Sequence, residues 1–127
     1  MKLTYFFIFN LLHMLIKKEQ RKEKQIAKEG IVWEYPLPSK DIGFALSKLN
    51  GRVPDSGWMR NKICNEIYYV ISGSGTLFIE DKKHELKEGD VFLIEPGKKF
   101  YIIAENLHLV LPTSPAWRPE QWENIKE

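Results

Sequence analysis

From Gly30 onward, short apolar stretches alternate with turn-forming residues at intervals of about eight to twelve positions. Each stretch is long enough for one strand, and this rhythm is typical of a β-sandwich or β-barrel. Turns are predicted at Asn50-Gly51, at Gly73-Ser74-Gly75 and at Asp81-Lys82-Lys83. Extended segments are predicted at 31–35, 42–49, 66–72, 75–80, 84–86, 91–95, 100–104 and 107–111. We therefore expect an all-β domain that covers residues 30–127.

The two ends of the chain have different patterns. Residues 11–29 are rich in helix-forming residues, but the part after Lys17 lacks an apolar stripe, so we expect it to be solvated. The C-terminal tail, from Pro112, is too rich in proline for a central strand. We expect this tail to wrap over the barrel and to use Trp117 and Trp122 as apolar contacts.

Residues 1–29 form an N-terminal extension in this interpretation. Its apolar run, Leu3 to Ile16, is shorter than the roughly 20 residues that cross a bilayer. Charged residues follow this run where a secretory signal would have a small-residue cleavage site. The extension is either a non-essential arm, with Met14 as an alternative start, or an element docked on the barrel, or a membrane anchor. A membrane span is the least supported of these three.

Length and charge narrow the class of protein. The 127 residues fit one domain. The formal net charge of +2 divides into +4 for residues 1–30 and −2 for the remainder, so no basic stripe for nucleic acid is expected. Cys64 is the single cysteine and the three histidines are scattered, which predicts neither a disulfide framework nor a zinc cluster. A reducing, cytoplasmic location is the corresponding expectation.

Two segments, Glu66 to Gly73 and Gly89 to Gly97, resemble the two motifs of the cupin family. The first motif has two histidines one residue apart, then a glutamate three or four residues later, and a glycine seven positions after that glutamate. The second motif has a Gly-Asp turn, an apolar strand, a Pro-Gly turn and a histidine three residues past the last glycine. The resemblance covers residues 50 to 112 approximately. It implies a double-stranded β-helix, the jelly-roll barrel of RmlC-like cupins.

The chain departs from the cupin motifs at the metal-binding positions. Depending on the spacing used, the two histidine positions of the first motif fall at Arg60 and Lys62 or at Met59 and Asn61, and the histidine position of the second falls at Phe100. Of the four ligands that the resemblance implies, Glu66 alone remains. One carboxylate does not hold a catalytic metal, which needs about three protein ligands. We therefore expect no metal and no other cofactor.

A remaining question is the environment of Glu66. In an unbroken strand, Arg60, Lys62, Glu66 and Tyr68 share one face, which the resemblance makes the barrel interior. A carboxylate in that interior needs a counter-charge, so Arg60 or Lys62 is the expected partner of Glu66. The alternative is a solvated strand end with ordinary exposed charges.

These residues predict a metal-independent cupin that binds a small anionic or polyhydroxylated metabolite. The candidate ligand-binding residues are Arg60, Lys62, Glu66, Tyr68, Phe100 and His108. One alternative is a metal-free isomerase, epimerase or lyase acting on a sugar or sugar acid, with proton exchange by Glu66 and Tyr68, either alone or together with His108. Another is a structural or regulatory module without a ligand. A perturbed carboxylate beside a cavity favours the enzyme, and a barrel filled by its own side chains favours the structural module.

We also expect a homodimer. Small cupins commonly associate through barrel strands, and an open sheet edge rich in apolar residues is otherwise an aggregation risk. A small molecule and a second copy of the chain are thus the expected partners, and neither nucleic acid nor a membrane is expected.

Overall fold

The computed structural model describes residues 14–126, and the regular secondary structure of this part of the chain is almost entirely β-strand. Two short 3₁₀ turns, η1 and η2, stand near its ends. The elements in chain order are η1 (Lys18–Gln20), β1 (Lys22–Ala27), β2 (Gly30–Tyr35), β3 (Gly43–Val53), β4 (Trp58–Asn61), β5 (Asn65–Ile79), β6 (Lys82–Lys87), β7 (Val91–Ile94), β8 (Lys99–Ser114), η2 (Pro119–Gln121) and β9 (Trp122–Ile125). The predicted all-β jelly-roll class is confirmed.

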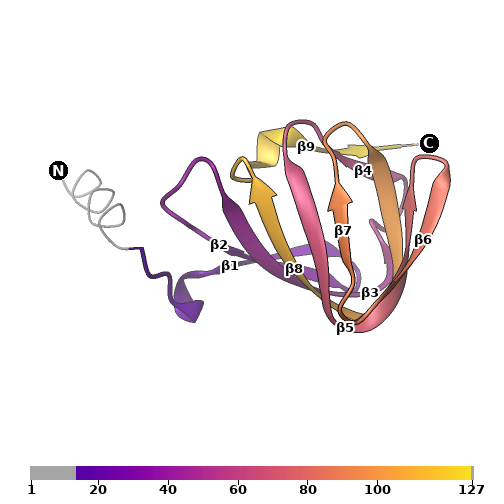
Figure 1. The fold of residues 1–127 in the computed structure, drawn as a ribbon, viewed down its shortest axis with the longest axis horizontal. Helices are drawn as coiled ribbons and strands as arrows, with labels where there is room; N and C mark the ends of the chain where they lie inside the picture. Colours follow the sequence, from indigo (N-terminus) through magenta and orange to yellow (C-terminus); the bar gives the residue numbers. More distant parts are fainter. Residues whose placement is uncertain (1–13, 127) are drawn as a thin grey trace.

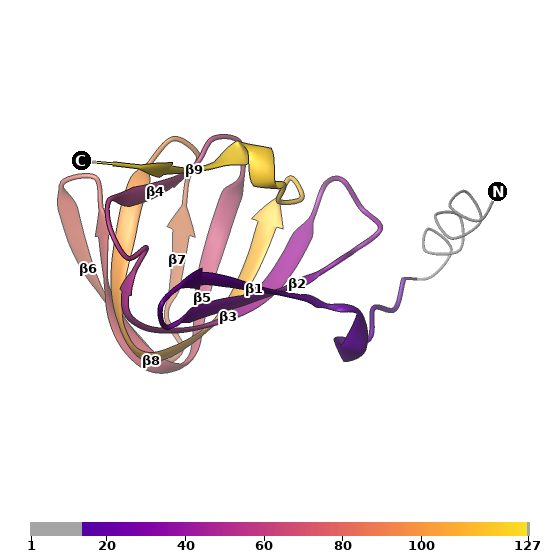
Figure 2. The same cartoon turned by 180° about the vertical axis from the view of Figure 1, so that it is seen from behind.

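All strand pairs are antiparallel, and the two longest strands hold the sheet together. The order along the main path is β1-β2-β3-β8-β4-β9, and β5 pairs with β6, β7 and β8. Because β5 and β8 pair over much of their length and both bend, the sheet curls back on itself. Figure 1 shows this curl, with the tail that carries η2 and β9 lying across its upper end. Figure 2, the view from behind, shows β1, β2 and β3 on the side of the interior opposite β5 and β7.

Two predicted turns are bends inside long strands. Asn50-Gly51 lies within β3, where the pairing register with β8 shifts between Leu49 and Gly51. Gly73 lies within β5, between two register shifts, so the predicted hairpin at Gly73-Ser74-Gly75 is wrong. Both glycines have a positive φ, +70° and +79°. Such a residue bends and twists a strand without ending it.

The predicted hairpin near residues 81–83 is confirmed, with its turn one residue earlier than expected. Ile79 pairs with Lys82, and the intervening Glu80 and Asp81 form a two-residue turn between β5 and β6. Glu80 has a φ of 52°, as hairpin turns of this length require.

The N-terminal part of the described chain contributes a strand where the sequence suggested a solvated, helix-prone segment. Strand β1 pairs with β2 through a hairpin that crosses the expected boundary at Gly30. Ala27 is buried at the end of β1. Residues 1–13, which include most of the apolar run, lie outside the described residues. Between residues 14 and 126, no helix has the length and hydropathy needed to cross a membrane.

Inward-facing side chains are large on most strands and small in the first part of β3. Val70 and Leu77 on β5 and Leu107 and Leu109 on β8 are fully buried. Over residues 43–47 of β3 the pattern is reversed: Gly43, Ala45 and Ser47 face inward, while the larger Leu46 faces outward and Phe44, which also borders the cavity, is 37% exposed. Apolar bulk is therefore missing from one wall of the barrel. The space that it leaves is the cavity described next.

Candidate functional site

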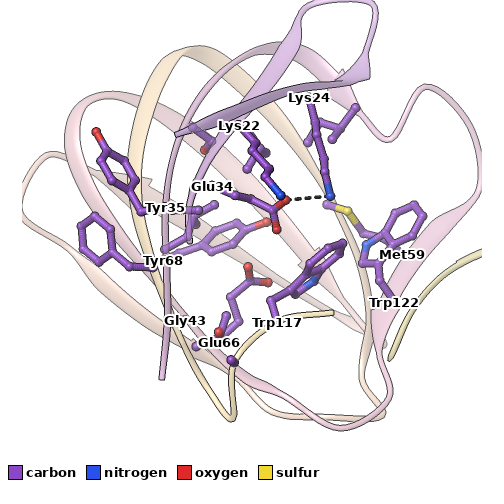
Figure 3. Close-up of a pocket in the computed structure, with 18 of the residues that line it drawn as sticks. Lys22, Lys24, Glu34, Tyr35, Gly43, Met59, Glu66, Tyr68, Trp117 and Trp122 are labelled. Carbon is purple, nitrogen blue, oxygen red and sulfur yellow. Dashed lines mark ion pairs between the residues drawn. The ribbon is translucent and has the colours of Figure 1, made fainter. Parts of the chain in front are cut away.

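The barrel contains a cavity of about 410 Å³. Its walls come from β1, β2, β3, β4, β5 and β8, and the C-terminal tail contributes Trp117 and Trp122 (Figure 3). The tail therefore wraps over the barrel with these two tryptophans, as the sequence predicted. A volume of this size is within the range of sites that bind small molecules.

Gly43 is required where β3 meets β8 and the tail. A Cβ atom at this position would lie 2.4 Å from Thr113 Oγ1 and 3.0 Å from the backbone nitrogen of Trp117. These distances are too short for any side chain, so glycine permits the close approach of the tail. Gly43 pairs with Thr113, which in turn pairs with Glu66. The glycine thus lies two strands away from the candidate acid.

Glu66 is the acidic group deep in the cavity. It is partly buried on β5, and its Oε1 accepts a hydrogen bond of 3.0 Å from Asn61 Nδ2. Burial raises the pKa of the Glu66 carboxyl from 4.5 to about 7, because the charged form loses solvation. The Asn61 N–H acts in the opposite direction, lowering this pKa, but burial dominates. Near neutral pH the carboxyl is therefore populated in both protonation states.

Tyr68 and Phe100 form the adjacent wall. Tyr68 lies two residues after Glu66 on β5 and is 5% exposed. Its ring meets the ring of Phe100 edge to face, with 6.1 Å between centroids. The pKa of Tyr68 lies well above its usual value, first because of burial and second because of the negative charge of Glu66. Tyr68 therefore remains a neutral hydroxyl at the edge of the cavity.

The cationic side chains of the cavity lie across from Glu66, as Figure 3 shows. Lys24 Nζ lies 2.7 Å from Glu34 Oε1 and 4.8 Å from the ring centroid of Trp117. Lys22 follows the same face of β1 and also lines the cavity. Among the described lining residues these two lysines are the only cations. The deep end, around Glu66, is uncharged apart from that carboxyl.

The structure distinguishes between the two spacings that the sequence left open for the histidine positions of the first motif. Met59 and Asn61 are 4% and 1% exposed and face inward, and Met59 pairs with Phe100. Arg60 faces the other way. The positions that hold imidazoles in metal-binding cupins are therefore occupied here by a thioether, an amide and a phenyl ring.

This donor set does not fit a catalytic metal. Around Glu66 the neighbouring groups offer one carboxylate, whereas a catalytic metal needs about three protein ligands. Within residues 14–126 no cluster of three or more His, Cys, Asp or Glu side chains is arranged to hold a metal ion.

Three of the six predicted site residues meet in the cavity and three do not. Glu66, Tyr68 and Phe100 line it together. Arg60 instead forms an ion pair with Glu123 of β9, and Lys62 is exposed. His108 lies on β8 between the inward-facing Leu107 and Leu109, so it belongs to the outer face.

The predicted pairing of Glu66 with Arg60 or Lys62 is wrong for a simple reason. The strand is interrupted at residues 62–64, between β4 and β5, so counting alternate residues across this break does not preserve the face. Arg60 and Glu66 consequently face opposite ways. Glu66 accepts a hydrogen bond from the neutral amide of Asn61 instead of pairing with a cation.

Several cavity residues were not singled out by the sequence analysis. They include Ser47 and Thr113, whose hydroxyl oxygens are buried and have no hydrogen-bond partner within the described part of the chain. The reversed pattern of β3, with small residues at 43, 45 and 47 and large ones between them, was a usable signal for Ser47. Glu34 and the lysines of β1 had no comparable signal.

Comparisons with solved structures identify the same fold. A variant of Streptomyces PAC13 with uridine is 13% identical, with a TM-score of 0.80 over 90% of this chain and 92% of the other. A further structure describes Pac13 as a nucleoside dehydratase. KdgF from Halomonas sp. is 15% identical, with a TM-score of 0.64 over 84% of this chain and 97% of the other.

Oxalate decarboxylase from Bacillus subtilis is 20% identical, with a TM-score of 0.74 over 88% of this chain, which spans only 32% of that protein. At such identities the likeness shows the fold alone. No curated protein matches the sequence. The family model of the cupin domain matches residues 50–108, the part of the chain from the bend in β3 to the middle of β8. The chain thus contains a cupin domain, with residues other than histidine at the positions that the motif resemblance assigns to imidazoles.

Proposed function

We propose that this cupin binds a small, neutral, hydroxylated molecule in its barrel and transfers a proton to or from it through Glu66, without a metal. The observation that carries the proposal is a carboxyl group with a pKa of about 7 that faces a cavity of about 410 Å³. A perturbed acid beside a cavity marks a candidate site for proton transfer. The reaction class is isomerisation, epimerisation or elimination.

The protonation behaviour of Glu66 suits either direction of proton transfer. An acid or base is most effective when its pKa lies near the working pH, because both forms are then populated. In its ionised form Glu66 would accept a proton from a carbon atom of the substrate. In its neutral form it would donate a proton to a hydroxyl group that leaves the substrate. Tyr68 provides a neutral hydroxyl beside it that can bind a substrate oxygen.

The charge distribution supports a neutral substrate over an anionic one. A substrate anion beside Glu66 would repel the carboxylate and raise its pKa further. The polar groups near Glu66 are an amide and hydroxyls, which suit the hydroxyls of a sugar or nucleoside. The two lysines lie across the cavity, and one of them is already paired with Glu34. A cavity that the protein's own side chains leave in the barrel also argues against a purely structural module.

Pac13 is described as a nucleoside dehydratase and its structures contain uridine, which agrees with this class of substrate. At 13% identity this agreement is an analogy at the level of the fold. We further propose a cytoplasmic location, because the single thiol, Cys64, needs no oxidising compartment.

A ligand screen followed by an isotope experiment tests the proposal. Neutral sugars and nucleosides, including uridine, are compared with sugar acids by thermal shift, and the neutral class should raise the melting temperature more. Any hit is then incubated with the protein in D₂O, and deuterium incorporation at carbon is followed by NMR. Incorporation should occur with the wild-type chain and be lost in Glu66→Gln.

A matched control is Glu95→Gln, which changes an exposed carboxyl outside the cavity lining and should leave the exchange unchanged. Binding of sugar acids alone would contradict the neutral substrate. Full deuterium exchange in Glu66→Gln would contradict the role of Glu66.

We also propose a homodimer formed through the outer face of β5 and β7. Tyr69 and Ile71 on β5 and Val91 and Leu93 on β7 are 41–62% exposed, and Tyr69 pairs directly with Val91. A contiguous apolar patch on the outside of a sheet is typical of an interaction surface. A second copy of the chain offers the same patch and would cover it symmetrically.

A further inference from the structure

Gln121 is a buried polar residue of the C-terminal tail. It does not line the cavity itself but contacts Asn61, the residue that donates to Glu66. It is 3% exposed and lies at the end of η2. Its Oε1 accepts hydrogen bonds from the backbone N–H groups of Ile63 and Cys64, at 3.3 and 3.1 Å. Its Nε2 donates to Asn61 Oδ1 at 3.0 Å. Gln121 therefore joins the break between β4 and β5 to the residue that contacts Glu66.

These hydrogen bonds have only one consistent direction. A backbone N–H can only donate, so the oxygen of the Gln121 amide must face residues 63 and 64. The NH₂ group of Gln121 then faces Asn61, whose oxygen must accept from it. The NH₂ group of Asn61 is consequently turned toward Glu66, and it donates to the carboxylate at 3.0 Å.

We infer that Gln121 is a positioning residue, which fixes the orientation of the Asn61 amide and thereby holds an N–H donor on the Glu66 carboxylate. The inference rests on the proposed role of Glu66 in proton transfer. Without Gln121, Asn61 is free to rotate its amide and to present its oxygen to Glu66. An oxygen there would favour the protonated carboxyl, and the group would no longer be available as a base at neutral pH.

The other groups around Glu66 do not supply this donor. The titratable neighbours are the thiol of Cys64 and the hydroxyl of Tyr68, and the pKa of each is raised first by burial and second by the Glu66 charge. Across the cavity lie the charged Lys22, Lys24 and Glu34. The neighbours from β3, β4, β7, β8 and the tail are not titratable, and they include Gly43, Met59, Ile94, Phe100, Thr113, Trp117 and Trp122.

The test is a titration of Glu66 in the ligand-free, full-length protein by NMR of its ¹³C-labelled carboxyl. Gln121→Met removes the donor and the acceptor while keeping the length of the side chain. The midpoint of the Glu66 titration should rise by about one pH unit, as loss of a hydrogen bond to a charged group implies. A merely structural role of Gln121 would lower the melting temperature without moving this midpoint.

The matched control is Asn124→Leu. Asn124 also holds the tail through its amide, which donates to the backbone oxygens of Ser56 and Trp58, but among the described residues its side chain has no hydrogen bond with Asn61 or Glu66. This variant should lose stability without a change in the Glu66 midpoint. If Gln121 acts through Asn61, adding Gln121→Met to Asn61→Leu should not move the midpoint further.

An unchanged midpoint in Gln121→Met, an equal rise in Asn124→Leu, or additive rises in the double variant would each overturn the inference. Should Gln121→Met fail to fold, Gln121→Asn takes its place, since its shorter side chain withdraws the amide from Asn61 without adding a charge beside Glu66. A midpoint that does not rise in this variant is again contrary to the inference. Because the titration needs no ligand, its result is independent of the substrate experiment.

Discussion

Replacing Glu66 by glutamine should stabilise the protein at high pH and have little effect at low pH. The pKa of the carboxyl is about 7 in the folded chain, against an ordinary value of 4.5 that we take for the unfolded chain. Between these values the unfolded chain releases the proton more readily, so the free energy of unfolding falls as the pH rises. The stabilising contribution of the protonated form is complete below pH 4.5 and is lost above pH 7.

The difference of about 2.5 pH units corresponds to about 3 kcal/mol, at 1.36 kcal/mol per unit. Glutamine is neutral at every pH and similar in shape to the protonated acid, and its oxygen can still accept from Asn61 Nδ2. The free energy of unfolding of Glu66→Gln, relative to wild type, should therefore increase by about 3 kcal/mol from pH 4 to pH 8.

Urea unfolding of both proteins at unit steps from pH 4 to pH 8, followed by tryptophan fluorescence, measures this difference. All other titrating groups are common to the two chains, so their contributions cancel. A difference that is flat over this range would show that the Glu66 carboxyl is solvated in the folded protein. A difference that falls with pH would mean that a cation stabilises the carboxylate after all.

Three further predictions follow from the described residues. Elemental analysis of the purified protein should find far less than one transition metal per chain, because Glu66 is the only metal-ligating side chain left of the family's four; about one equivalent would contradict this. Light scattering at tens of micromolar should give a dimer for the wild type and a monomer for Val91→Lys with unchanged circular dichroism; a monomeric wild type contradicts the dimer. Gly43→Ala should lower the free energy of unfolding by about 1–3 kcal/mol, since its methyl group would collide with Thr113 Oγ1; an unchanged urea midpoint would refute the tight contact.

Local sequence features showed where most strands lie and that histidine is missing from the metal-binding positions of the motifs. Apolar and polar residues alternate within the segments that became β2, β3, β6 and β7. A strand that is buried on one face needs this alternation wherever it lies in the fold, so these strands could be located from the sequence. The motif resemblance singled out Gly73, Gly89 and Gly97, and all three have a positive φ. The absence of histidine at the metal-binding positions of the motifs was visible without any structure, since it depends on residue identity alone.

Local features did not distinguish a bend from a chain reversal. A glycine with a positive φ is compatible with both, and the outcome depends on pairing with a distant strand. Strand β5 continues through Gly73 because β8 pairs with the residues on both sides of it. Strand β1 was missed for a similar reason, since its exposed, charged residues form a strand through pairing with β2.

The sequence by itself thus determined the fold class and identified Glu66, Tyr68 and Phe100 as residues that meet. The tertiary structure alone decided which neighbours Glu66 has. Arg60 turns outward to Glu123 because the break at residues 62–64 resets the alternation of faces. Asn61 turns inward and is oriented by Gln121, a residue 60 positions away. Both the cavity and the raised pKa of Glu66 depend on how far side chains from distant strands fill the interior, which is decided by the whole fold and cannot be read from any short segment.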